Sequence, residues 1–358
     1  MSFVSKNKKF LNLDNLRVFY DRKENVIKLT STDEDLAGKP FQITLKQGTE
    51  SEATLRDLLI ENEVITEEEV DPQYGIPKYV KYPERKEDCS KWHEVPIGAG
   101  KNGETITVDL MKAPHALVVG YTGSGKSVFL RNYILHSLRH QNNWAVFGID
   151  LKRVEFSPYK NVPSIKAIAS DFDEAVVMLE YLNDIMAKRY QQMEEENVSN
   201  FFLLKELPKA AMLMIEEATV LFTQEGYKTE EGRNRDKQAA RAQEIVGNLV
   251  RLGRAAGIFV TIATQRPSVE VIPGEMRANL DTRVAMSRLD STPSALTLGN
   301  DNASKIPSNL KGRGIVRSHG LYDESGNKVS ETEIFFQTFY SSPNLQDEII
   351  EFKDDLSN

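Results

Sequence analysis

Cysteine is almost absent from this sequence of 358 residues, and Cys89 is the only one. A single thiol forms no intramolecular disulfide, and it excludes a zinc site built from several cysteines. This scarcity is typical of proteins from a reducing cytosol. We therefore expect a fold held together by a hydrophobic core, for which an apolar content of 40% is ordinary.

Long apolar runs are missing as well. The sequence contains no run of about 18 apolar residues, the length that a membrane-spanning helix needs. The N-terminal stretch MSFVSKNKKFLNL also lacks the apolar segment of a secretory signal. We expect a cytoplasmic protein without direct membrane insertion, which reaches a membrane only peripherally, through a partner.

An excess of positive charge is the third absence. The net charge is -8, acidic residues predominate in residues 1–90 and 341–358, and residues 91–340 carry equal numbers of both signs. A broad basic surface for nucleic acid is therefore not indicated by composition. Contacts with phosphates have to come from local loops.

The most informative stretch is VVGYTGSGKSV, residues 118–128, which fits the P-loop pattern G-x-x-x-x-G-K-[ST]. Glycines let the backbone N–H groups converge on phosphate oxygens, the lysine supplies a charge for the outer phosphates, and the serine hydroxyl is placed to bind Mg²⁺. We expect a buried strand over residues 116–119 and a helix after the loop, whose N-terminus adds positive partial charge. The predicted nucleotide-binding residues are Gly120, Tyr121, Thr122, Gly123, Ser124, Gly125, Lys126, Ser127 and Val128.

A buried strand that ends in two carboxylates is expected at AAMLMIEEATVLF. We predict that Glu216 assists the metal and that Glu217 polarises the attacking water. The first position is more often Asp, and the longer side chain of Glu216 can shift the metal contact or route it through water. The alternative is a solvated acidic pair at the end of a strand.

The stretch LVRLGRAAGIFVTIATQRPS combines a helix end with another buried strand. Gln265, at the tip of this strand, is predicted to sense the terminal phosphate. Arg251 and Arg254 share one face near the helix end, and we predict that they reach the ATP of a neighbouring subunit. Their alternative role is to complement the dipole at the helix C-terminus.

Strands and helices alternate from residue 91 onward, which predicts an α/β fold with a mainly parallel central sheet flanked by helices. We expect strands over 145–150, 211–217, 258–264 and 282–287, a helix over 171–196 and a second helix ending at 254.

The whole chain divides into four parts. Residues 1–70 read as a small α+β module with strands in NLRVFYDRKENVIKLTS and PFQITLKQ and a helix in EATLRDLLIENEVI. Residues 71–90 are acidic and proline-bearing and read as a linker. The motor is expected over 91–340, with an acidic tail or helix over 341–358.

Several segments resemble the motor of FtsK/SpoIIIE DNA translocases, within the HerA-FtsK group of P-loop ATPases. They are HALVVGYTGSGKSV, GIDLKRVEFSPY, MIEEATVLF and RLGRAAGIFVTIATQRPSVEVIPGEMRANLDTRVAMS. The resemblance covers residues 96–317. It implies a RecA-like motor that uses ATP and Mg²⁺, a homo-oligomer in the form of a hexameric ring with ATP between subunits, and DNA or polypeptide passing through the centre.

Two departures from the chromosomal translocases narrow the expectation. We expect no membrane-spanning N-terminus, and the roughly 40 residues after the end of the resemblance at residue 317 leave no room for a winged-helix domain. The chain is most similar to coupling proteins of conjugative elements, so we expect ATP-driven DNA transfer with a membrane-anchored or relaxosome partner. A type VII protein-export motor, a phage genome-packaging ATPase and a slowly hydrolysing interaction module remain alternatives.

The sequence suggests more than one role for each of three groups of basic residues. Lys152 and Arg153 contact nucleic acid backbone or pair with local carboxylates. His136 and His140 are spaced for a metal, but no acidic third ligand is near in sequence, so we expect a solvated helix face. The stretch TQEGYKTEEGRNRDKQAAR is either a pore-facing segment or a disordered surface loop, with cations at Lys228, Arg233, Arg235, Lys237 and Arg241.

Overall fold

The computed structural model separates the chain into two units, Met1–Glu68 and Glu69–Asn358. The described residues are the strands at 3–4, 10–11, 16–21, 26–31 and 70–71, and residues 75–83, 91–226, 228–322, 328–329 and 333–341. Each unit is described by itself.

The first unit contains two antiparallel strand pairs. β1 (Phe3–Val4) pairs with β2 (Phe10–Leu11), and β3 (Leu16–Asp21) pairs with β4 (Val26–Ser31). The second pair falls within the alternating run NLRVFYDRKENVIKLTS, for which strands were expected. The strand expected in PFQITLKQ and the helix expected in EATLRDLLIENEVI lie outside the described residues.

The second unit is built on a mixed sheet of 11 strands. Its parallel half contains, in spatial order, β11 (Ile165–Ala169), β10 (Trp144–Ile149), β12 (Ala210–Ile215), β13 (Ile258–Thr264), β9 (His115–Val119) and β14 (Thr282–Met286). β12, β13 and β9 are buried along their whole length, as expected for strands covered on both faces. This half confirms the predicted parallel sheet.

An antiparallel half extends the sheet beyond β14 and was not predicted from the sequence. It continues with β15 (Arg313–Arg317), β17 (Glu333–Thr338), β7 (Glu94–Ala99), β8 (Thr105–Asp109) and β16 (Leu321–Tyr322). β7 and β8 precede the P-loop in the chain, whereas their neighbours follow the parallel half. Such pairing between distant segments leaves no local sequence signal.

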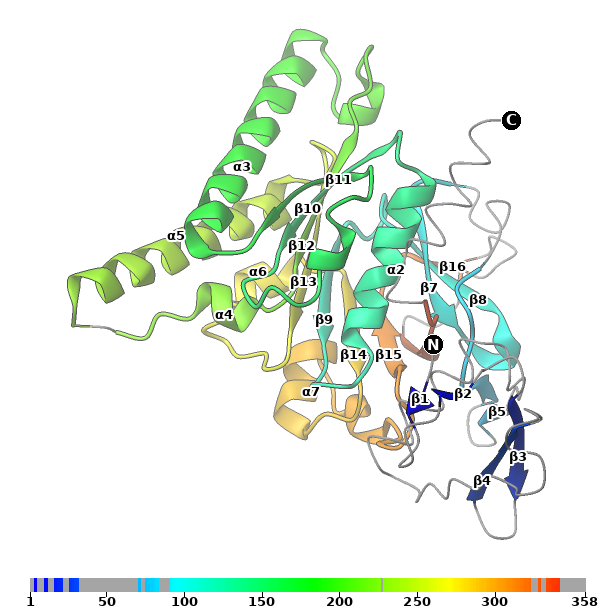
Figure 1. The fold of residues 1–358 in the computed structure, drawn as a ribbon. Helices are drawn as coiled ribbons and strands as arrows, with labels where there is room; N and C mark the ends of the chain where they lie inside the picture. The colour runs from blue at the N-terminus through cyan, green and yellow to red at the C-terminus, as the bar shows by residue number, and fades with distance from the viewer. Residues whose placement is uncertain are drawn as a thin grey trace. The chain divides into compact units, whose positions relative to one another are not determined.

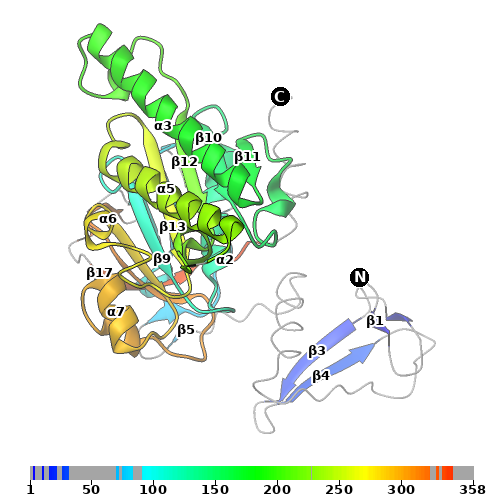
Figure 2. The ribbon, with the colours of Figure 1, turned by 90° about the vertical axis from the view of Figure 1, so that its left-hand side faces the viewer.

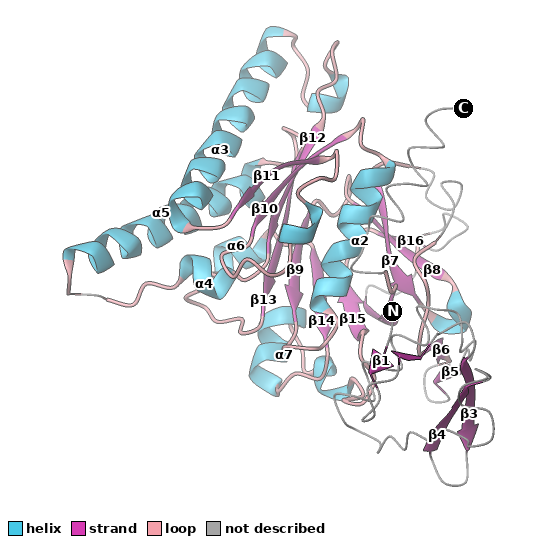
Figure 3. Cartoon of the chain, viewed as in Figure 1, coloured by secondary structure: helices cyan, strands magenta, loops and turns pink. Residues whose placement is uncertain are grey.

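Helices cover both faces of the parallel half (Figures 1 and 2). α3 (Phe172–Glu195) and α5 (Glu230–Leu252) pack together on one face, and α2 (Lys126–Arg139) lies on the other. Successive residues of β9 show the division, because Leu117 and Val119 belong to the core under α3 and α5, whereas Val118 belongs to the core under α2. The short helices α4 (Ala218–Phe222), α6 (Gly274–Ala278) and α7 (Ser291–Leu298) complete the layers (Figure 3).

α2 corrects the expectation of a helix with one solvated face. Nearly all its residues are buried, because it packs against β7 as well as β10. His136 is fully buried with its Nε2 atom 2.8 Å from the carbonyl of Trp92, and its ring lies against that of His140. The imidazole of His136 is therefore part of the packing between α2 and the segment before β7, and the predicted solvated face was wrong.

The expected linker at 71–90 also differs from the structure. β5 (Val70–Asp71) pairs with β6 (Ile76–Pro77), and Ile76 and Tyr82 are buried. The backbone N–H of Tyr82 donates a hydrogen bond to the carbonyl of Tyr340 at 2.9 Å. The segment 75–83 therefore packs against the motor through Ile76 and Tyr82, and residues 84–90 lie outside the described residues. Among the helices that the structure describes, none is long and apolar enough to cross a membrane.

Candidate nucleotide-binding site

The P-loop connects β9 to α2 at the carboxyl edge of the parallel strands (Figure 1). Gly125, which precedes the first helical residue, has a left-handed backbone with φ 98°. A Cβ atom on Gly120 would meet Ser124 Oγ at 2.5 Å and the carbonyl oxygen of Met286 at 2.6 Å. The loop therefore requires glycine at both positions.

The first turn of α2 is free to bind an anion. No side chain caps the N-terminus of this 14-residue helix. Its first N–H groups have no partner within the helix, and the helix dipole adds positive potential there. Together with the buried Lys126, the loop fits the phosphates of a nucleotide.

The two glutamates that follow β12 lie against the P-loop lysine. Lys126 Nζ donates to the backbone carbonyl of Glu216 at 3.1 Å and to its Oε1 at 3.3 Å, and it lies 3.8 Å from Glu217 Oε2. Both glutamates are buried. The structure thus brings together the lysine and the two carboxylates that the sequence placed 90 residues apart.

The pKa values of the two carboxyl groups move in opposite directions. Burial raises the pKa of Glu216 above its ordinary value despite the charges of Lys126 and Lys152. Burial acts in the same sense on Glu217, but the hydrogen bond from Thr264, the charge of Lys126 and the amide of Gln265 outweigh it and lower its pKa. Glu217 is therefore the group held as a carboxylate, which suits a residue that accepts a proton from water.

Gln265 links Glu217 to the P-loop. Its backbone N–H donates to Glu217 Oε1 at 3.1 Å, and its side-chain oxygen accepts from the Thr122 hydroxyl at 3.3 Å. The amide reaches this position because β13 and β9 are hydrogen-bonded neighbours whose carboxyl ends meet. Gln265 thus lies where a terminal phosphate on the P-loop would be sensed.

The loop after β10 contributes two residues that sequence reasoning did not assign to this site. Lys152 Nζ lies 3.2 Å from Glu217 Oε2 and 3.7 Å from Glu216 Oε2, so this lysine faces the nucleotide site. Ser127, the predicted magnesium ligand, donates its hydroxyl hydrogen to Glu155 Oε1 at 2.6 Å. The signal available in the sequence was the position of Lys152 and Glu155 just after the strand expected over 145–150, since the carboxyl ends of neighbouring parallel strands form a common site.

The donor set fits Mg²⁺ as well as a nucleotide. Carboxylate and hydroxyl oxygens are the ligands that Mg²⁺ takes from proteins, and it usually keeps several waters. Glu216 Oε2 is buried without a hydrogen-bond partner, as is expected of an atom that lacks its cation or water. Ser127 and Glu216, named as metal ligands from the sequence, both lie at this edge of the sheet.

Arg251 and Arg254 lie at the opposite, amino edge of the parallel strands. Arg251 donates a hydrogen bond to Asn248 Oδ1 at 2.7 Å, and its guanidinium lies 3.4 Å from Glu275 Oε1. Arg254 is close enough to His115, the first residue of β9, for its charge to add to the burial that lowers the pKa of this histidine to about 3. Neither arginine therefore shares the pocket of its own P-loop.

Further arginines occupy this amino edge. Arg283 and Arg317 are directly opposite each other on β14 and β15. Within the described residues, no carboxylate lies within ion-pair distance of the four residues that we call the amino-edge arginines, which are Arg254, Arg277, Arg283 and Arg317.

The stretch 223–241 was left open between a pore-facing segment and a disordered loop. Residues 230–241 form the first half of α5, whose N-terminus is capped by Thr229, so they are not a disordered loop. Arg235 lies over the ring of Phe172 and Arg241 pairs with Glu180 and Glu244, whereas Lys228, Arg233 and Lys237 are exposed.

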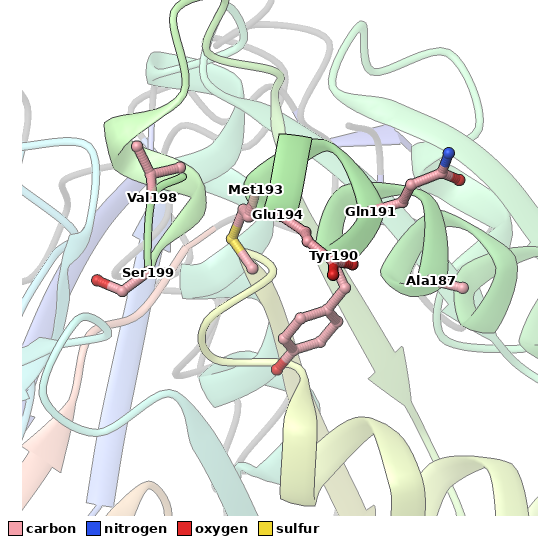
Figure 4. A pocket seen from close by; sticks show the side chains of 7 residues that line it. All are labelled: Ala187, Tyr190, Gln191, Met193, Glu194, Val198 and Ser199. Atoms are coloured by element: carbon pink, nitrogen blue, oxygen red, sulfur yellow. The ribbon is translucent and has the colours of Figure 1, made fainter. Parts of the chain in front are cut away.

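A separate cavity of about 520 Å³ lies near the end of α3 (Figure 4). It is lined by Ala187, Tyr190, Gln191, Met193, Glu194, Val198 and Ser199. It contains none of the residues around the P-loop, and its lining groups form no catalytic arrangement.

The fold and this site define the class of protein. A parallel sheet with a P-loop between β9 and α2, paired glutamates after β12 and a polar amide after β13 is a RecA-like P-loop ATPase fold. Residues 82–234 match the FtsK/SpoIIIE family. This match supports an FtsK-type motor in the chain.

Relatives in sequence agree with this family. The DNA translocase FtsK of Agrobacterium fabrum is 32% identical over 292 residues, which cover 72% of this chain and 32% of that protein. The DNA translocase FtsK of Mycobacterium leprae is 32% identical over 228 residues, which cover 60% of this chain and 27% of that protein. The chain thus spans about a third of the length of these curated relatives.

A solved structure is similar over nearly the whole chain. It is the pCW3 conjugation coupling protein TcpA in monomer form with ATPgS, which is 25% identical, with a TM-score of 0.66. The alignment covers 94% of this chain and 93% of that chain.

Proposed function

We propose that this chain is an ATP-driven DNA translocase of a mobile genetic element, working as the coupling ATPase of conjugative transfer. The observation that carries the proposal is the site in which Lys126, Glu217 and Gln265 converge on the P-loop. The similarity to a conjugation coupling protein over 94% of this chain and 93% of that chain supports the biological setting. The likeness to the type VII secretion ATPase EccC of Thermomonospora curvata is one of fold alone, since that chain is 19% identical at a TM-score of 0.52.

Each residue of the site has a role in this proposal. The P-loop and Lys126 hold the phosphates, while Ser127 and Glu216 hold Mg²⁺, which would neutralise charge on the transferred phosphoryl group. Glu217 accepts a proton from the attacking water, and Gln265 orients that water against the terminal phosphate. Thr264 keeps Glu217 in its ionised form by donating to it at 2.7 Å.

The ring and its shared active site are also part of the proposal. Transition-state charge on the phosphoryl group requires a cation besides Lys126, and an arginine supplies it in related ATPases. Arg251 and Arg254 lie too far from their own P-loop for this task, at the opposite edge of the sheet. In a hexameric ring, such residues act on the ATP of the neighbouring subunit.

DNA contacts in this proposal come from exposed cations. Arg233 and Lys237, which follow one another at i and i+4 on α5, have no ion pair among the described residues. Six copies would place a ring of positive charge around the central axis, even though the motor itself carries no net excess of base.

The deciding experiment measures ATP hydrolysis with and without DNA. We expect duplex or single-stranded DNA to stimulate turnover, and Lys126→Ala to abolish both basal and stimulated hydrolysis. An ATP hydrolysis rate that is unchanged by DNA but rises with a protein substrate would indicate an export motor instead. Normal turnover of Lys126→Ala would overturn the site itself.

A further inference from the structure

The loop after β10 holds a carboxylate that faces the P-loop serine from outside the paired glutamates. Ser127 Oγ donates to Glu155 Oε1 at 2.6 Å, and this is a charge-assisted hydrogen bond of the short, strong kind. Glu155 is half-buried, and within the described residues it has no ion pair with a lysine, arginine or histidine. Its negative charge is therefore not neutralised by a basic side chain among the described residues.

The loop is built to hold Glu155 in this place. Asp150, which is fully buried at the end of β10, accepts hydrogen bonds from the backbone N–H groups of Glu155 at 2.8 Å and Phe156 at 2.9 Å. The ring of Phe156 fills the space above Gly148, where a Cβ atom would meet it at 2.8 Å. The backbone that carries Glu155 is therefore held in place by Asp150 and Phe156, and the carboxylate of Glu155 reaches Ser127 from this anchored position.

A serine that binds a metal has to direct its oxygen lone pairs at the cation. A hydroxyl has one hydrogen, and once Ser127 donates it to Glu155 the lone pairs of Oγ are left for another partner. Groups that orient a metal ligand in this way raise metal affinity even though they do not touch the ion.

The charges around Ser127 also favour a divalent cation at this position. The two ammonium groups of Lys126 and Lys152 lie against the two carboxylates of Glu216 and Glu217, which leaves these four groups balanced. Glu155 adds one further negative charge on the side of Ser127. The position next to Ser127 Oγ is thus the part of the site where a cation gains most.

We propose that Glu155 is a positioning residue for the magnesium of this site, acting through Ser127 by accepting its hydroxyl hydrogen and turning Oγ toward the ion. The inference rests on the proposed ATPase function. It assigns no role to Glu155 in binding the nucleotide itself, so metal and nucleotide affinities are expected to separate in its variants.

Binding of Mn²⁺ in the presence of ADP, followed by electron paramagnetic resonance, tests this directly on the full chain. We expect Glu155→Gln to weaken Mn²⁺ affinity about 10- to 100-fold while ADP affinity measured without metal stays at the wild-type value. Glu155→Asp keeps the charge on a shorter side chain, so its Mn²⁺ affinity should lie between those of the wild type and Glu155→Gln. Glu206→Gln, a change at an exposed glutamate on the loop before β12, is the matched control and should leave Mn²⁺ binding unchanged.

A double-mutant cycle separates positioning from direct ligation. If Glu155 acts through Ser127, then Ser127→Ala with Glu155→Gln binds Mn²⁺ no more weakly than Ser127→Ala alone. Additive losses, or equal losses of ADP affinity with and without metal, would overturn the proposal. Wild-type protein that binds neither ADP nor Mn²⁺ with ADP would instead overturn the ATPase function on which it rests.

Discussion

Thr264 donates its hydroxyl hydrogen to Glu217 Oε1 at 2.7 Å, joining the end of β13 to the carboxylate at the end of β12. This bond opposes the effect of burial and helps to keep the pKa of Glu217 below its ordinary value. The carboxylate is thereby ready to accept a proton at neutral pH. The bond also fixes its orientation toward the P-loop.

Removal of this hydrogen bond should shift the acidic limb of the ATPase pH profile. In Thr264→Val the pKa of Glu217 rises, so hydrolysis is lost at a higher pH as the solution is acidified. Loss of a bond worth about 1 kcal/mol also lowers turnover by about fivefold. Thr261→Val, on the same strand, is the control, and an acidic limb that stays in place would contradict this role of Thr264.

The two glutamates should differ in their variants. Glu217→Gln retains Mg-dependent ATP binding but lowers kcat by about 10²- to 10⁴-fold, because the proton acceptor is gone. Glu216→Gln mainly raises the Mg²⁺ concentration needed for half-maximal rate. Steady-state kinetics at varied Mg²⁺ measures both, and the opposite pattern would exchange the two roles.

Salt dependence should separate the cations at the active site from those that face DNA. Each phosphate contact contributes about 0.9 to the slope of log K against log salt concentration for duplex DNA. We expect Arg233→Ala and Lys237→Ala to lower this slope, while Lys152→Ala lowers turnover and leaves the slope unchanged. Fluorescence titrations with a labelled duplex at several salt concentrations provide the measurement. A reduced slope in Lys152→Ala would show that this lysine contacts DNA, contrary to the expectation.

Mixed rings test whether the active site is shared. Lys126→Ala and Arg254→Ala subunits are each expected to be inactive, with a loss for the arginine of about 10³- to 10⁵-fold. Their mixture recovers part of the activity, because some interfaces combine an intact P-loop with an intact arginine. Arg251→Ala and Arg283→Ala, mixed in the same way, identify which arginine acts. No recovery with any of them, and a rate per subunit independent of protein concentration, would count against a shared site.

Two buried histidines should make the fold sensitive to acid. Burial lowers the pKa values of His115 and His136 to about 3. Between pH 6.5 and 3 the unfolded chain takes up protons that the folded chain does not, so the free energy of unfolding decreases as pH falls. Each histidine contributes about 1.4 kcal/mol per pH unit. In urea titrations from pH 6 to 4, His136→Gln should show a shallower decrease than the wild type, and parallel curves would be inconsistent with this explanation.

Most strands of the parallel half and the phosphate loop could be predicted from the sequence, whereas β11 at its edge was not predicted. The apolar run at residues 258–264 predicted β13 with its observed bounds, and the helix expected over 171–196 is α3, which starts after the cap Asp171. These features are local: a buried parallel strand is typically a continuous apolar run, a side chain such as Asp171 favours a helix start, and a P-loop needs its glycines at fixed spacing.

The contacts that Lys152 and Glu155 make in this site could not be predicted from the sequence. The strand order places β10 beside β12 and β12 beside β13, and this brings Lys152 to Glu217 and Glu155 to Ser127 across gaps of 65 and 28 residues. The antiparallel strands likewise bury His136 under segments that lie before the P-loop in the chain. Such contacts depend on how strands pair and helices cross, and these arrangements are chosen by packing over the whole core, which no local pattern of residues encodes.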